Sequence, residues 1–195
     1  MDDNYRDVVL LIGNAGAGKS TTGMILTTDC TELEVYSARR GLSYLIKDVN
    51  GTKIGASIVS KTIFPDLMIN PENNVAFYDC PGFRDTRRNT SIDLVNTLFL
   101  QRITRHAKSV KILIIVNYNA VTVGGSRGEF LNLLESTLNL VRTVERFSDS
   151  IGMVATKVYS DMTDEEIVNE IQNFLTYDVK GAYRFYRILQ TTIQL

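Results

Sequence analysis

Residues 13–20 read GNAGAGKS and fit the spacing G-x-x-x-x-G-K-[ST]. Glycines such as Gly13 and Gly18 let a backbone wrap an anion with its amide N–H groups pointing inward. Lys19 adds a positive charge for the outer phosphates, and the Ser20 hydroxyl is a hard oxygen ligand for Mg²⁺. The pattern therefore predicts a loop that binds the phosphates of a nucleotide.

An apolar run at 8–12 precedes this loop and a helical pattern at 19–28 follows it, as such a loop requires. The alternative is a glycine-rich strand-to-helix turn that binds nothing. We predict that these residues contact the nucleotide phosphates: Gly13, Asn14, Ala15, Gly16, Ala17, Gly18, Lys19, Ser20 and Thr21.

A second motif lies at 75–86, which read VAFYDCPGFRDT. Asp79 ends an apolar strand pattern, and Gly82 follows three residues later. We expect Asp79 to hold Mg²⁺ together with Ser20, and the Gly82 amide to sense the γ-phosphate. Taken alone, the segment would also suit an ordinary strand-to-turn transition.

The two motifs in this order resemble those of the translation-factor-related P-loop GTPases. The chain is most similar there to the septins, the chloroplast-import GTPases and the immunity-associated GTPases, although it has DCPG where those families have DTPG. The resemblance extends over residues 8–176, along which the motifs follow one another in the same order as in those families. It implies an α/β three-layer G domain: a mainly parallel central sheet with one antiparallel strand, helices on both faces, and GTP or GDP bound with Mg²⁺.

The resemblance also implies a hydroxyl ligand between the two motifs. Ser60, in the segment VSKT at 59–62, lies at the matching distance before Asp79, with Thr62 as the second choice. Ser60 is then expected to bind Mg²⁺ and the γ-phosphate, and to act in catalysis with Lys19 and Gly82. The alternative is that both hydroxyls merely alternate along a strand.

GTPases of these families usually recognise guanine with [NT]-K-x-D. Thr156 and Lys157 match this pattern, but Tyr159 stands at the position of the acid. Losing a charged acceptor for two donors costs roughly 2–4 kcal/mol of base discrimination. We still expect guanine, with Tyr159 stacking on the base or Asp161 replacing the acid. The alternatives are that the chain binds adenine nucleotides or that it binds nucleotides without a base preference.

Hydrolysis is expected to be slow. Phe83 occupies the position where small GTPases carry the glutamine that orients water, and a phenyl ring cannot do so.

Short apolar runs alternate with longer amphipathic stretches, which indicates βαβ units around a mainly parallel sheet. The expected strands are 8–12, 56–63, 75–79, 110–116 and 151–156. The expected helices are 19–28, 93–106, 129–146 and 165–175. Because the turn at 70–74 is close to both, 56–63 and 75–79 should pair antiparallel.

Composition narrows the class of protein. The 195 residues have a net charge of −1 and two cysteines, Cys30 and Cys80. This argues against a nucleic-acid partner and against a disulfide framework, and favours the reducing cytoplasm. The apolar runs are too short for a transmembrane helix. We expect one domain over 1–195, cut from a longer protein.

The leading hypothesis is a switch that binds GTP with Mg²⁺, hydrolyses it slowly, and self-associates as a homodimer across the nucleotide face. The alternatives are an ATP-binding or non-selective P-loop NTPase, and a catalytically weak scaffold domain that binds nucleotide.

Overall fold

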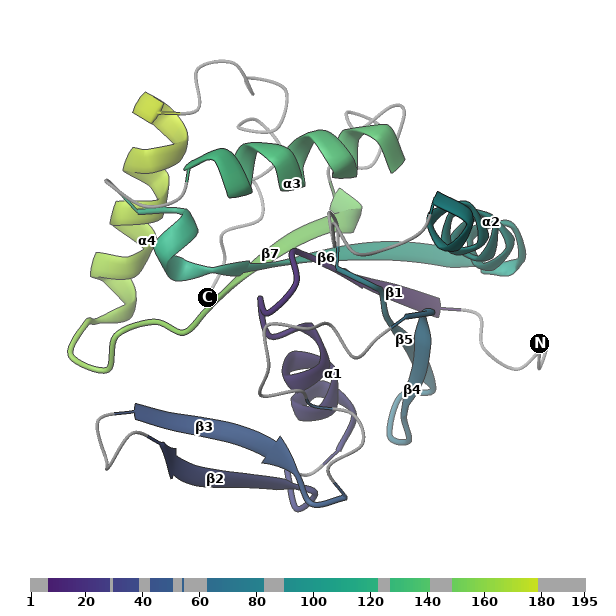
Figure 1. The fold of residues 1–195 in the computed structure, drawn as a ribbon, viewed down its shortest axis with the longest axis horizontal. Helices are drawn as coiled ribbons and strands as arrows, with labels where there is room; N and C mark the ends of the chain where they lie inside the picture. Colours follow the sequence, from purple (N-terminus) through teal and green to yellow (C-terminus); the bar gives the residue numbers. More distant parts are fainter. Residues whose placement is uncertain are drawn as a thin grey trace. The chain divides into compact units, whose positions relative to one another are not determined.

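The computed structural model describes residues 7–28, 30–38, 43–50, 54, 63–82, 90–122, 127–140 and 149–178. The chain divides into two compact units, 1–111 and 112–195, and each is described by itself. The coloured elements in Figure 1 follow the chain from its amino end to its carboxyl end.

Three strands of the first unit lie side by side in the order β4-β5-β1. They are β1 (Asp7–Ile12), β4 (Asp66–Asn70) and β5 (Val75–Asp79). β1 and β5 run parallel, whereas β4 and β5 run antiparallel with Asp66 opposite Asp79. The expected combination of parallel pairing with one antiparallel strand is confirmed.

The position predicted for the antiparallel strand was wrong. The partner of β5 is Asp66–Asn70, not 56–63; Ile63 is in a bend, and 56–62 lie outside the described residues. The tight turn explains the difference. The Asn70 side-chain oxygen accepts from the amides of Glu72 at 2.9 Å and Asn73 at 3.3 Å, so β4 ends at the turn itself.

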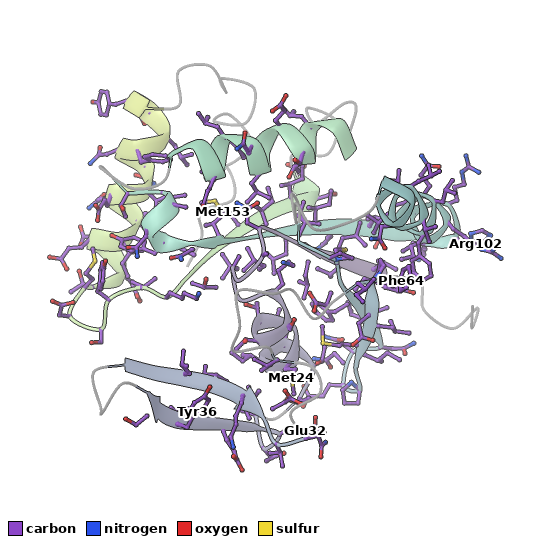
Figure 2. The ribbon with its side chains drawn as sticks, in the orientation of Figure 1. Met24, Glu32, Tyr36, Phe64, Arg102 and Met153 are labelled. Carbon is purple, nitrogen blue, oxygen red and sulfur yellow. The ribbon has the colours of Figure 1, made fainter. Side chains whose placement is uncertain are left out.

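Helix α1 (Lys19–Thr27) packs against β1, β4 and β5. Gly23 permits this close approach, because a Cβ there would lie 2.1 Å from the Met68 Cε on β4. Met24 of α1 is buried in the same contact region (Figure 2). Helix α2 (Thr90–His106) begins three residues before the predicted 93–106.

The hairpin of β2 (Leu33–Ala38) and β3 (Ser43–Asp48) was not predicted. One of its faces carries the Lys47–Glu34 ion pair at 2.9 Å, with the Lys47 ammonium 5.8 Å from the Tyr36 ring centroid. Figure 2 labels Tyr36 on this hairpin. Apolar and polar residues do not alternate cleanly in either strand, so the usual strand pattern is weak.

The second unit begins within β6 (Ser109–Asn117) and continues through β7 (Ile151–Thr156), which pairs parallel to it with Ile112 opposite Ile151. Its helical segments are η2 (Tyr118–Ala120), α3 (Arg127–Leu140), α4 (Asp164–Asn173) and η4 (Phe174–Asp178). Both strands match their predicted positions closely. For α3, the predicted part at 141–146 lies outside the described residues.

Helix α4 begins with a capping box. The Glu166 amide donates to the Thr163 hydroxyl oxygen at 3.3 Å, and the Thr163 amide donates to the Glu166 carboxylate at 2.8 Å. These bonds to Thr163 lower the pKa of Glu166. Across the described ranges, no helix is both long and apolar enough to cross a membrane.

Candidate functional site: a phosphate-binding loop

The loop at 13–18 and Asp79 meet because two parallel strands end together. In the β1–β5 register Leu11 lies opposite Asp79, and the Cys80 amide donates to the Leu11 carbonyl at 3.1 Å. Ligands of parallel sheets bind beyond the carboxyl ends of the strands. The first unit therefore brings both sequence motifs to the expected edge.

The loop takes a backbone shape that glycine permits. Gly16 and Gly18 have φ of 75° and 96°, in the left-handed region, and the Ala17 amide donates to the Asn14 carbonyl at 3.2 Å. Gly18 is the N-cap of α1, has no side chain to cap the helix, and is followed by no acidic residue in the first turn. The positive end of the α1 dipole thus lies at the loop without a neutralising carboxylate in that turn.

Lys19 is held within the loop. Its side chain is 6% exposed, and its ammonium donates to the carbonyls of Gly13 at 3.1 Å and Asn14 at 2.9 Å. The backbone therefore fixes a buried positive charge at the place where the sequence predicts phosphate. Thr21 follows in the first turn of α1 and is half-buried.

Ser20 and Asp79 are 59 residues apart in sequence, yet the Ser20 hydroxyl donates to an Asp79 carboxylate oxygen at 2.5 Å. Asp79 is 3% exposed. A hydroxyl beside a carboxylate is a set of hard oxygen donors that suits Mg²⁺. No cluster of three or more His, Cys, Asp or Glu side chains that could hold a metal ion occurs in the described part of the chain.

Gly82 lies directly against the loop. A Cβ at this buried glycine would be 2.7 Å from the Ala15 amide nitrogen, 2.9 Å from the Ala15 Cα and 3.2 Å from the Asn14 carbonyl carbon. Backbone atoms cannot move aside as a flexible side chain would. At Gly82 the second motif thus approaches the backbone of the first too closely for a Cβ, which requires glycine at this position.

Cys80, between Asp79 and the loop, is a packing residue. Its side chain is 2% exposed, and burial together with the Asp79 charge raises the pKa of the thiol to about 12. The thiol stays protonated near neutral pH and is a poor nucleophile.

The residues predicted to contact the base lie in the second unit. The Thr156 hydroxyl, at the end of β7, donates to the Val116 carbonyl at 3.1 Å, and Lys157 has a left-handed φ of 58°. The Tyr159 hydroxyl donates to the Asn119 side-chain oxygen at 2.8 Å. Tyr159 is 55% exposed, so part of its ring faces solvent.

A second tyrosine orients the Tyr159 ring. The Tyr118 and Tyr159 rings meet edge to face, with centroids 6.0 Å apart and an interplanar angle of 85°. Tyr118 is buried and donates from its hydroxyl to the Glu170 carboxylate; burial and this bond raise its pKa. Sequence reasoning missed both Tyr118 and Asn119. They follow directly after the apolar run of β6, where strand ends gather functional side chains.

Several predictions fall outside the described residues. They concern the metal ligand Ser60, its alternative Thr62 and the hydrophobic Phe83.

No protein-family model matches the chain, and no curated protein sequence matches it. Solved G-domain structures show distant structural similarity. The GDP form of the signal recognition particle receptor SRb from Chaetomium thermophilum has a TM-score of 0.40 and 13% identity, over 94% of this chain and 76% of that one. A GDP-bound S. thermophilus NFeoB mutant has a TM-score of 0.39 and 13% identity; the match covers 77% of this chain, which spans 43% of that one. The T. maritima FeoB G domain has a TM-score of 0.33 and 12% identity, over 86% and 98% of the two chains.

Replacing Gly82 with alanine tests the contact between the two motifs. We expect Gly82→Ala to lower the free energy of unfolding by about 1–3 kcal/mol, because the new methyl group displaces the Ala15 backbone. Gly128→Ala in α3 is the matched control, since a Cβ there meets no atom within 4 Å. Urea unfolding followed by circular dichroism measures both. Equal stability of Gly82→Ala and the unmodified chain would contradict the described contact.

Proposed function

We propose that the chain binds a nucleoside triphosphate with Mg²⁺ at the loop 13–20, and that it is a cytoplasmic GTP-binding switch with slow hydrolysis. The observation that carries the proposal is the convergence of Lys19, Ser20 and Asp79 at one strand edge, with the Ser20 hydroxyl 2.5 Å from Asp79. These three side chains supply the charge and the hard oxygen ligands that a magnesium-bound triphosphate needs.

Each group has a distinct task in this proposal. The amides of the loop and the first turn of α1 bind phosphate oxygens, and Lys19 neutralises the outer phosphates. Ser20 and Asp79 would hold Mg²⁺, whose charge offsets that of the β- and γ-phosphates. Because Lys19 already bonds to the Gly13 and Asn14 carbonyls, its position needs little reorganisation when phosphate arrives.

The contact of Gly82 with Ala15 supports the switch component of the proposal. A γ-phosphate bound by the loop would approach the Gly82 amide, and its loss on hydrolysis would release that bond. In the same proposal Ser60 contributes the second γ-phosphate contact, and two copies associate across the nucleotide face in the GTP state.

Calorimetric titration with GTP and with ATP in the presence of Mg²⁺ tests nucleotide binding. We expect GTP to bind the unmodified chain, and Lys19→Ala to weaken binding roughly 30- to 1000-fold, because charge-assisted hydrogen bonds to phosphate are lost. Lys108→Ala is the control, since this exposed lysine lies after α2 and away from the loop sequence.

Binding of neither nucleotide by the folded chain would refute the proposal. Nucleotide that stays bound for hours without phosphate release would instead identify a nucleotide-binding scaffold.

The role of Ser20 is tested through the Mg²⁺ dependence of binding. We expect Mg²⁺ to strengthen GTP binding to the unmodified chain, and Ser20→Ala to reduce that gain roughly tenfold or more, because a direct oxygen ligand is removed. Thr22→Ala, two residues further along α1, should keep the gain. Titrations with Mg²⁺ and with a chelator provide the comparison. An unchanged Mg²⁺ effect in Ser20→Ala would exclude this hydroxyl as a ligand.

Tyr159 favours a second candidate function, a P-loop NTPase without strong base selectivity. Its hydroxyl bonds to Asn119, and the position lacks the carboxylate that would accept from guanine. We expect Tyr159→Asp to raise the ratio of GTP to ATP affinity roughly 30- to 1000-fold, by restoring a charged acceptor. Tyr159→Phe keeps a ring and should leave the ratio unchanged. Competition binding measures both ratios, and an equal ratio in Tyr159→Asp would remove this position from base recognition.

A further inference from the structure

Helix α2 presents an apolar surface where a surface helix normally carries polar side chains. Its buried positions are Asn96, Leu100 and Ile103, which share one face. Leu94 and Leu98, on the opposite side of the helix by its 3.6-residue period, are 61% and 55% exposed. Val95 at 46% and Phe99 at 36% widen this strip. We refer to these four exposed residues as the α2 apolar strip.

Basic side chains continue the same outward face toward the end of the helix. Arg102 and Arg105 are exposed one and two turns beyond Leu98, and exposed Lys108 follows α2 directly. Residues 94–111 contain no aspartate or glutamate. Figure 2 shows Arg102 extending outward from α2. The outward face is therefore apolar in its first half and cationic in its second.

A separate pair of exposed apolar residues lies in the segment before β4, on the side of the buried face of α2 and not on the α2 apolar strip. The Asn96 side-chain amide donates to the Ile63 carbonyl at 3.0 Å, which fixes that segment beside the helix. Ile63 and Phe64 are each 52% exposed. Apolar patches of several side chains with a polar rim usually mark an interaction site.

We propose that this face of α2 binds the surface of an anionic phospholipid membrane. Interfacial helices combine apolar side chains that enter the membrane surface with basic residues that attract anionic lipids, and the outward face of α2 carries both. Arg102, Arg105 and Lys108 would then lie at the level of the phosphate headgroups, where each basic residue near the surface adds attraction. The cations favour an anionic occupant, and residues 94–111 themselves carry no carboxylate.

A second copy of α2 is the competing occupant. In an antiparallel pair related by a two-fold axis, the basic end of one helix would lie against the amino end of the other, where Asp93 stands. Self-association of the chain without vesicles that Leu98→Glu abolishes would identify this occupant and overturn the proposal.

Sedimentation of the full 195-residue chain with lipid vesicles tests the proposal. We expect the chain to sediment with vesicles of phosphatidylcholine mixed with phosphatidylserine, to bind vesicles of phosphatidylcholine alone far more weakly, and to be released progressively by salt. Absence of binding to either vesicle, or equal binding to both, overturns the proposal.

Two variants separate the apolar and cationic contributions. We expect Leu98→Glu, and the double change Arg102→Glu with Arg105→Glu, each to weaken vesicle binding roughly tenfold or more. Val35→Glu on β2 is the matched control, because Val35 is also exposed, at 66%, and lies outside α2. Circular dichroism verifies that each variant is folded. Equal losses in Val35→Glu and Leu98→Glu, or binding unaffected by the arginine changes, would refute the assignment to α2.

Discussion

The parallel register of β1 and β5 is the constraint on which the candidate site depends. Leu11 lies opposite Asp79 in this register, so the loop after β1 and the turn after β5 leave the strands at the same level. This register brings Ser20 and Asp79 within hydrogen-bond distance although they are 59 residues apart in the sequence. The pairing of β1 with β5 positions the candidate site, and the side chains of the site supply charge and oxygen atoms.

The site concentrates charge in a place with little water. Lys19 and Asp79 are 6% and 3% exposed, and a buried charge is costly unless other groups compensate it. The carbonyls of Gly13 and Asn14 partly solvate the Lys19 ammonium, and the Ser20 hydroxyl donates to Asp79. In the proposed function, an anionic phosphate would lie beside Lys19 and a cation beside Asp79.

The position of the loop between β1 and α1 could be predicted from the sequence because its geometry is local. Gly16 and Gly18 adopt left-handed φ within one continuous segment, and Lys19 reaches only five and six residues back. The Thr163 capping box is local in the same way. Features that depend on pairing between segments were harder to predict. The antiparallel strand lies at Asp66–Asn70 because the Asn70 turn fixes its end. The spacing of apolar residues in the sequence did not predict this position.

The arrangement around Tyr159 could not be predicted for a related reason. Its hydroxyl partner Asn119 and its ring partner Tyr118 come from another strand end, 40 or more residues away. In the proposed function, phosphate binding rests mainly on backbone amides and glycine conformations, whereas base recognition rests on the Tyr159 side chain and its neighbours. The proposal therefore implies that substitution at Tyr159 changes base preference while the loop at 13–18 keeps its shape.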